Sequence, residues 1–374
     1  MLIALVVVFF YPYVIYPVVL YLIVRRRQHP TRLAGESACP TVALVISALN
    51  EEGVIAQKLA NCLELDYPRG RLRIVVISDG STDRTAEVAR RFAGEAVEII
   101  EQTARRGKLA NLNEILPRRT EEILVLSDAN VMYRADAVRK LVRRFQDPEV
   151  GCVSGKVILT DSAPALDQPT AGYYSLEWFL QAAASSIYSM AGADGAMYAL
   201  RRELFRPCPA GTLIEDFAIP MAVIGQGKRV VHEPEAVGWE RGPSSLREEF
   251  RRKARIAAGA AQALLRGNGW PPLRAPAGFW FVFVSHKLLR WISPLIGAAI
   301  VAYAIGSSAQ PLAQAILAGI CGVSLLAGLQ LVSRSASRWL TVPFYFLFGQ
   351  IAAGWGLLRG IAGQQSVLWA KENR

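Results

Sequence analysis

The 374-residue chain has few of the residues that build metal clusters or disulfide frameworks. It contains three histidines, which lie far apart in the sequence, and five cysteines, none of them in a Cys-x-x-Cys pair. An odd number of scattered cysteines argues against a disulfide-stapled fold and is typical of a reducing compartment. The same shortage argues against a zinc site or a His-rich metal centre. Internal repeats and low-complexity tracts are also missing.

Acidic residues are scarce relative to basic ones. The chain has 31 Asp and Glu against 42 Lys and Arg, which gives a formal net charge of +11. Nucleic-acid-binding proteins share such a charge, but they rarely combine it with long apolar runs, and here hydrophobic residues make up 52% of the sequence. The combination predicts a membrane protein whose cytoplasmic parts hold the basic residues, with the lipid bilayer and not a nucleic acid as its partner.

The first apolar run covers residues 2–24 and is followed at once by three arginines at 25–27. A run of this length can cross a bilayer. A cleaved signal peptide has its basic residues before the apolar run and a small-residue cleavage site after it, which is the reverse order. We therefore predict a retained transmembrane helix over residues 1–24 of a bacterial-type cytoplasmic membrane protein. Its C-terminal end lies in the cytoplasm, and a linker over residues 25–40 follows.

The C-terminal region, residues 278–374, is apolar again and predicts three further crossings. The first of them is interrupted by His286, Lys287 and Arg290, so its boundaries are the least regular. With about four transmembrane helices in total, Arg338 falls on the same side as the first arginine cluster, as the positive-inside rule requires. The apolar runs cover residues 279–305, 310–332 and 339–358.

Between the two membrane regions, residues 41–247 have the pattern of a cytoplasmic α/β domain. Short apolar runs alternate with segments of helical spacing, which predicts a mostly parallel, Rossmann-like sheet covered on both faces. Residues 173–190 predict a further helix, in the core or at the membrane interface, and residues 248–277 predict a basic amphipathic helix at that interface. The predicted strands cover residues 42–47, 73–78, 97–100, 123–127 and 150–159, and the helices 51–65, 82–92, 108–116 and 135–146.

Polar side chains follow three of the predicted strands. Asn50 and Glu52 come after the first strand, Asp79 after the second, and Asp128 and Asn130 after the fourth. Each residue taken alone could be a helix cap or a turn residue. In a doubly wound sheet, however, ligands bind beyond the carboxyl ends of the strands, so residues on several strand ends converge on one crevice. We therefore expect these side chains to line a ligand site.

The charges expected at this crevice suit a nucleoside diphosphate. Carboxylates can bind the base, the ribose and a metal, and Lys108 adds a cation for the phosphates unless it only begins a solvated helix. Asp128 and Asn130, two residues apart, offer oxygen ligands of the kind that hard cations prefer. The residues by themselves thus predict a nucleotide and metal site.

A second acidic pair, Glu215 and Asp216, precedes an apolar helix. The pair could simply favour the positive end of the helix dipole. Alternatively, one carboxylate could remove the proton of an acceptor hydroxyl as a general base. Arg252 and Arg255 could then stabilise a leaving diphosphate, bind lipid headgroups, or do both.

Seven segments occur in a fixed order over residues 41–260: SALNEE, SDGSTD, RRGK, SDAN, GADGAMYALRR, IEDF and RRKARI. In this order and with the flanking apolar helices, the chain resembles the membrane-integral family-two glycosyltransferases, which include the cellulose, chitin, hyaluronan and poly-N-acetylglucosamine synthases. The resemblance implies a GT-A fold, a UDP-sugar donor, Mg²⁺ or Mn²⁺, and inversion at the anomeric carbon.

The resemblance also implies a role for each matching residue. Asp216 would be the catalytic base, and Asp128 and Asn130 would occupy the metal position. The acceptor would meet Asp194, Gly195 and Glu215. The nucleotide sugar would be bound by Asn50, Glu52, Asp79, Lys108, Asp128, Arg252 and Arg255.

The chain departs from the family pattern at four positions. Asn130 replaces the second Asp of the metal motif, Leu49 replaces an aromatic residue before Asn-Glu, and Arg252 and Ile256 replace the Gln and Trp of Q-x-x-R-W. Because that Trp supports the acceptor sugar in processive synthases, its loss leaves two acceptors open, a polysaccharide and a lipid such as a ceramide, a diacylglycerol or a polyprenyl carrier. A non-catalytic subunit that senses a nucleotide or takes part in transport is the alternative outside enzymes.

Overall fold

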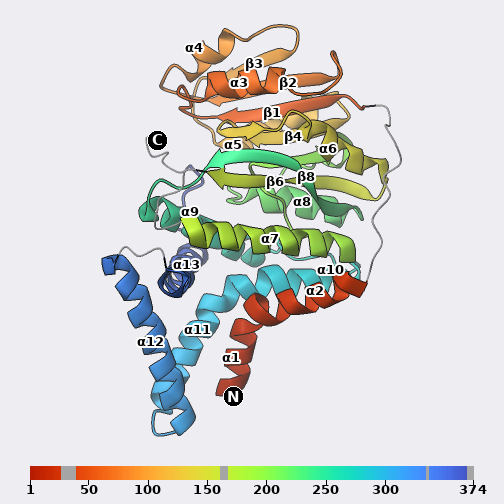
Figure 1. Ribbon diagram of the computed structural model, residues 1–374. Helices are drawn as coiled ribbons and strands as arrows, with labels where there is room; N and C mark the ends of the chain where they lie inside the picture. Colours follow the sequence, from red (N-terminus) through yellow and green to blue (C-terminus); the bar gives the residue numbers. More distant parts are fainter. Residues whose placement is uncertain (27–38, 161–166, 334–336, 369–374) are drawn as a thin grey trace.

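The computed structural model describes residues 1–26, 39–160, 167–333 and 337–368. An eight-stranded sheet forms the upper part of the molecule in Figure 1, and the helices α1, α11 and α12 extend away from it below. The strand order is β3-β2-β1-β4-β7-β6-β8-β5. The strands are β1 (Val42–Ala48), β2 (Leu72–Asp79), β3 (Val97–Gln102), β4 (Ile123–Asp128), β5 (Val131–Tyr133), β6 (Val150–Thr160), β7 (Met197–Arg201) and β8 (Arg229–Arg241).

The sheet is mostly parallel. The strands β1 to β4 all run in the same direction. β7 is antiparallel to both of its neighbours, β4 and β6, whereas β8 is parallel to β6 and antiparallel to β5. The carboxyl ends of β1, β2 and β4 therefore meet at one edge of the sheet, where the polar residues predicted for the site lie.

Apolar cores on both faces of the sheet explain why its central strands are almost continuously buried. One core packs under α3 (Ile55–Leu63), α4 (Thr85–Arg90) and α6 (Ala137–Arg143). The other packs under α5 (Lys108–Ile115) and α8 (Glu215–Gly225) and continues into the first C-terminal helix through Phe279 and Phe283. The α/β domain and the membrane helices thus share a core.

Four helices are long and apolar enough to cross a membrane, one N-terminal and three C-terminal, as predicted. The first, Leu2–Arg26, consists of α1 (Leu2–Phe10), a π-helical turn (Tyr11–Ile15) and α2 (Tyr16–Arg26). The second, Ala277–Gly306, consists of α10 (Ala277–Val282), a π-helical turn (Phe283–Leu288) and α11 (Leu289–Gly306). The others lie within α12 (Pro311–Ser333) and α13 (Arg338–Ile361).

The polar patch expected to interrupt the first C-terminal crossing lies within one continuous helix. Nε2 of His286 lies 2.8 Å from a carboxylate oxygen of Glu177, and Arg290 donates to the other oxygen at 2.7 Å. Glu177 belongs to α7 (Asp167–Ile187), the long helix between the sheet and the membrane helices in Figure 1. The patch therefore joins the second span to the α/β domain.

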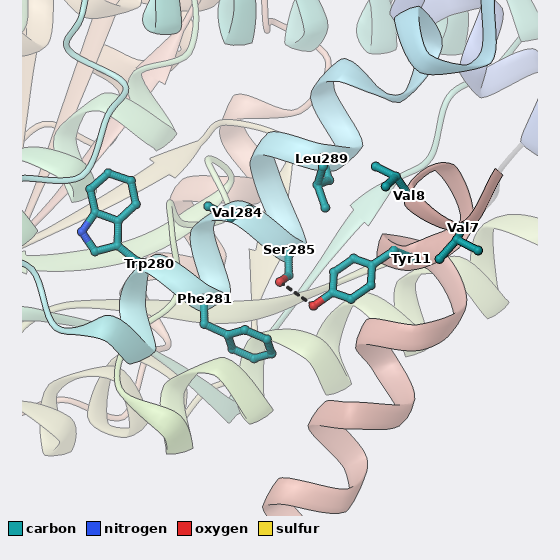
Figure 2. A pocket seen from close by; sticks show the side chains of 8 residues that line it. All are labelled: Val7, Val8, Tyr11, Trp280, Phe281, Val284, Ser285 and Leu289. Carbon is teal, nitrogen blue, oxygen red and sulfur yellow. Dashed lines mark hydrogen bonds between the residues drawn. The ribbon is translucent and has the colours of Figure 1, made fainter. Parts of the chain in front are cut away.

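An apolar cavity of about 520 Å³ lies between the first two spans. Figure 2 shows its lining, with the hydroxyl groups of Tyr11 and Ser285 hydrogen-bonded at 3.0 Å. The remaining lining residues are Val7, Val8, Trp280, Phe281, Val284 and Leu289.

The last span, α13, packs against α9 (Leu246–Leu265), the helix that carries the two arginines of the predicted site. Glycines make this close approach possible. A Cβ atom at Gly356 would overlap the backbone of Ala254, and one at Gly360 would overlap the backbone of Ala258. On its other side α9 is equally close to the segment before α8, because a Cβ atom at Gly259 would lie 2.6 Å from Cγ2 of Ile214.

We predict that Gly356→Ala lowers the thermal stability of the purified protein more than Gly349→Ala does. Both substitutions add the same methyl group to α13 and gain similar helix propensity. Only position 356 meets neighbouring backbone, whereas nothing lies within 4 Å of a Cβ atom at Gly349. Overpacking of this kind costs about 1–3 kcal/mol. Equal midpoints of thermal unfolding in detergent would contradict the packing described here.

Candidate active site

The ammonium group of Lys108 contacts three separate segments of the chain. It lies 2.7 Å from Oδ1 of Asp128 at the end of β4 and 3.0 Å from Oε1 of Glu215 at the start of α8. It also donates to the carbonyl oxygen of Gly195 at 3.3 Å. Residues from four of the predicted motifs therefore meet around one cation.

Lys108 and Glu215 stabilise each other's charged forms. Burial by itself would lower the pKa of Lys108, but Asp128 and Glu215 outweigh it and raise this pKa above its usual value. Burial would raise the pKa of Glu215, but Lys108 and then Arg255 outweigh it and lower that pKa. Lys108 and Glu215 are thus both ionised at neutral pH.

Asp79 positions the loop that leads into Lys108. Its buried carboxylate accepts hydrogen bonds from the backbone N–H groups of Arg106 at 2.7 Å and Gly107 at 2.8 Å, and from Nδ2 of Asn111 at 2.8 Å. Gly107 adopts a positive φ of 92°, which favours glycine, immediately before α5 begins. Asp79 lies at the predicted crevice, and in this structure it fixes the position of Lys108 there.

Asn50 and Glu52 lie at the same edge, where they join the loops that follow β1 and β2. Oδ1 of Asn50, a residue with a positive φ of 53°, accepts from the backbone N–H of Thr82 at 2.8 Å. The carboxylate of Glu52 accepts from the backbone N–H of Arg84 at 3.1 Å and pairs with its side chain. Because these residues bind across the loops, α3 and α4 begin three or more residues later than predicted, at Ile55 and Thr85.

Lys58 binds the turn that holds Asp128 and Asn130 from the interior of the domain. This fully buried side chain on α3 donates to Oγ of Ser127 at 2.9 Å and to the carbonyl oxygen of Val131. Burial lowers the pKa of Lys58. On the solvent side, Nδ2 of Asn130 donates to Oε1 of Glu240 on β8 at 3.0 Å.

Glu240 was not among the residues predicted from the sequence. Burial, followed by repulsion from Asp128 and Asp194, raises its pKa to about 7. Its position becomes visible only through β8, a strand whose pattern is broken by charged residues and Pro234 and which the apolar periodicity does not indicate. In the part of the chain that the structure describes, no three His, Cys, Asp or Glu side chains form a complete metal cage. Asp128 and Asn130 suit a cation that a bound phosphate group also coordinates.

The loop that contains Asp194 and Gly195 packs directly on the predicted base, Asp216. A Cβ atom at Gly195 would lie 2.9 Å from Oδ2 of Asp216, and the backbone N–H of Ala193 donates to the carbonyl oxygen of Asp216 at 2.8 Å. Asp194 is held in turn by Ser154, whose Oγ accepts from the backbone N–H of Asp194 at 2.9 Å. Only a residue without a side chain fits at position 195 beside this carboxylate.

The environment of Asp216 keeps its carboxyl group basic. Burial and then the neighbouring charge of Glu215 raise the pKa of Asp216 to about 6, and Arg255, Lys108 and Lys287 act in the opposite direction. A carboxylate with a raised pKa accepts a proton more readily than an ordinary surface Asp does. Its position and its raised pKa make Asp216 a candidate general base.

The two arginines of α9 have different partners. Arg255 donates to the carbonyl oxygen of Leu213 at 3.3 Å, next to the acidic pair on α8. Arg252 forms a bidentate ion pair with Glu249 at 2.8 and 3.0 Å, and Glu249 also accepts from the hydroxyl of Tyr345 on α13 at 3.1 Å. Arg255 thus belongs to the cluster around Lys108, whereas Arg252 contacts an acid on its own helix.

Comparison with known proteins agrees with this geometry. Residues 40–259 match the family described as Glycosyltransferase like family 2. The chain is 28% identical over 239 residues to the probable glycosyltransferase YdaM of Bacillus subtilis, which covers 61% of this chain and 57% of that protein. It is 32% identical over 133 residues to β-monoglucosyldiacylglycerol synthase of a Nostoc species, which covers 34% of this chain and 28% of that protein. The chain thus spans less than two thirds of the length of both sequence relatives.

A solved structure is similar over almost the whole chain. The mannosyltransferase PcManGT of Pyrobaculum calidifontis, in complex with GDP-Man and Mn²⁺, superposes with a TM-score of 0.73 and 26% identity, and the match covers 96% of this chain and 97% of that one.

The mostly parallel sheet, the acidic residues at its carboxyl edge and the four candidate spans define a membrane glycosyltransferase of the GT-A fold. The chain belongs to the glycosyltransferase-like family 2. The predicted fold and enzyme class are confirmed.

We predict that Lys108→Met abolishes most of the activity and destabilises the protein. The substitution leaves Asp128 and Glu215 without their shared cation. Because these side chains are only partly buried, the cost should lie between the roughly 0–1 kcal/mol of a surface pair and the roughly 3–5 kcal/mol of a fully buried one. Arg84→Met breaks the exposed pair with Glu52 instead and should cost only about 0–1 kcal/mol. Nucleotide release and thermal midpoints measure both effects, and equal behaviour of the two variants would refute the central role of Lys108.

Proposed function

We propose that this protein is an inverting glycosyltransferase that moves a hexose from a nucleoside-diphosphate sugar to a lipid acceptor at the cytoplasmic face of the membrane. One observation carries the proposal. A basic carboxylate, Asp216, stands beside the Lys108 cluster and at the same time next to a candidate span, because the ring of Phe217 packs on Trp291 at 5.0 Å. The reacting groups of a nucleotide sugar and of a membrane lipid can meet there.

The reaction is a single displacement. The acceptor hydroxyl oxygen forms a bond to the anomeric carbon as the bond from that carbon to the diphosphate breaks, so the configuration inverts. Asp216 takes the hydroxyl proton. Lys108 and Arg255 stabilise the negative charge that develops on the departing diphosphate. Asp194, Gly195 and Glu215 shape the acceptor side of the cleft.

A divalent cation, Mg²⁺ or Mn²⁺, completes the donor site in this proposal. The residues present fit such an ion, because Asp128 and Asn130 offer oxygen ligands at one turn and a diphosphate supplies the others. The full-length similarity to a mannosyltransferase solved with Mn²⁺ supports it. When bound, the ion neutralises charge on the leaving diphosphate.

Two observations bear on the nucleotide of the donor. The motif resemblance favours a UDP-sugar, with Asn50, Glu52 and Asp79 close to the base. The structural relative that matches 96% of the chain was solved with GDP-Man, which favours GDP-mannose. A screen of UDP-glucose, UDP-N-acetylglucosamine, UDP-galactose, UDP-glucuronate and GDP-mannose, scored by nucleotide release, identifies the donor.

Three observations favour a lipid over a growing polysaccharide as the acceptor. Ile256 stands where processive synthases have the Trp that supports the acceptor sugar. One sequence relative is a glucosyldiacylglycerol synthase. An apolar pocket lies between the first two spans (Figure 2), and its lining residue Trp280 is joined to Phe217, beside Asp216, by a row of packed rings through Phe283 and Trp291. Product sizing by mass spectrometry tests this choice, and a ladder of polymer lengths would reverse it.

We predict that Asp216→Asn reduces turnover by at least about a hundredfold, the usual contribution of a general base, while donor binding persists. The amide keeps the shape of the side chain but cannot take a proton. Asp66→Asn, which affects only an exposed pair with Arg139, serves as the matched control and should retain activity. Full turnover by the Asp216 variant would remove this residue from the mechanism.

We also predict that kcat/KM falls about tenfold per pH unit below pH 6, because a protonated Asp216 cannot act as a base. The charged groups around it are Glu215, Lys108, Arg255 and Lys287. Glu215 raises the pKa of Asp216, so Glu215→Gln should move the acidic limb of the profile to lower pH. A profile that stays flat down to pH 4.5 in the wild-type protein would contradict the assignment.

A further inference from the structure

Glu240 lies at the end of β8 and faces the turn that carries Asp128 and Asn130. β5 and β8 are antiparallel, and their pairing places Glu240 opposite Val131, the residue after Asn130. Oε1 of Glu240 accepts a hydrogen bond from Nδ2 of Asn130 at 3.0 Å. The carboxylate of Glu240 therefore lies beside the oxygen donors that we propose for the cation.

The hydrogen bond between Asn130 and Glu240 has a consequence for charge. The related motif has an Asp at position 130, but two carboxylates at this separation would repel each other strongly without a cation between them. The amide of Asn130 avoids that repulsion and holds Glu240 by donating to it. The negative charge that the related motif has at position 130 is thus carried by Glu240 on the facing strand, β8.

Three other acids of this region have cations as partners. Lys108 contacts Asp128 and Glu215, and Arg252 contacts Glu249. Within the described parts of the chain, no ion pair engages Glu240, and its side-chain hydrogen bond comes from a neutral amide. A half-buried carboxylate of this kind gains from a cation that arrives with the substrate.

We infer that Glu240 supplies the second acidic ligand for the divalent cation of the donor diphosphate, with Asn130 as its positioning residue. This inference rests on the proposed function. Magnesium-like cations at phosphate sites are usually held by one or two carboxylates together with phosphate oxygens and water. Asp128 and Glu240 provide two such carboxylates from facing strands, which agrees with the lack of a complete protein cage among the described residues.

The test moves the carboxylate from position 240 to position 130. The purified full-length protein is titrated with Mn²⁺ in the presence of GDP and, in parallel, of UDP. Free Mn²⁺ is quantified by electron paramagnetic resonance, which gives the affinity. We expect Glu240→Gln to weaken Mn²⁺ binding by at least about tenfold. The double variant Asn130→Asp with Glu240→Gln returns a carboxylate to the site and should regain most of the affinity. Glu235→Gln, on the same strand but paired with Lys140, is the matched control.

Two results would overturn the inference: unchanged Mn²⁺ binding by Glu240→Gln, or a double variant that stays as weak as Glu240→Gln. Thermal midpoints and nucleotide affinity without Mn²⁺ show whether each variant is folded. Failure here is separable from failure of the proposed function. If the wild-type protein transfers sugar but Glu240→Gln binds Mn²⁺ as tightly as the wild type, only the assignment of Glu240 as a ligand is refuted. Full turnover by Asp216→Asn would refute the general base and would leave the conclusion on Mn²⁺ binding unaffected.

Discussion

The ammonium group of Lys108 is the interaction on which the rest of the site depends. Three segments that are distant in the sequence present oxygen atoms to it, from Asp128, Glu215 and Gly195. Two like charges would otherwise face each other across the cleft at substantial cost. Asp79 contributes indirectly, because it binds the backbone immediately before Lys108 and so fixes where the cation stands. The ends of β4 and α8 and the loop that contains Gly195 are thus held together by one cation.

Much of the fold follows from simple patterns. The strands β1, β2 and β4 each contain a short buried apolar run because helices cover both of their faces. Apolar runs do not predict β7 and β8, because β7 has only five residues and β8 contains charged residues and Pro234. The starts of α3 and α4 are also displaced, because Asn50, Glu52 and their neighbours bind across loops, a tertiary effect that local helix signals do not contain.

Sequence patterns predicted that most of these candidate residues lie together, but not which contacts they make. The strand-end rule places Asp79 and Asp128 at one edge, and the structure agrees. Three contacts depend on tertiary packing that no spacing along the chain specifies. They are the ion pair between Lys108 on α5 and Glu215 on α8, the different partners of Arg252 and Arg255 on α9, and the approach of Glu240 on β8. The contacts of the buried Lys58 could not be predicted either, because in the sequence this residue occupies one position of an ordinary amphipathic helix.

The attachment of α7 to the second span fixes the position of the α/β domain relative to that span. His286 and Arg290 hold Glu177 from within the helix that continues toward Trp291 and Phe217. A buried ion pair of this kind resists sliding, since separating its members exposes charge to an apolar environment. The carboxyl edge of the sheet is therefore held at one position relative to the second candidate span. For the lipid acceptor proposed above, the reach of its hydroxyl group beyond the hydrocarbon would then decide selection together with its chemical identity.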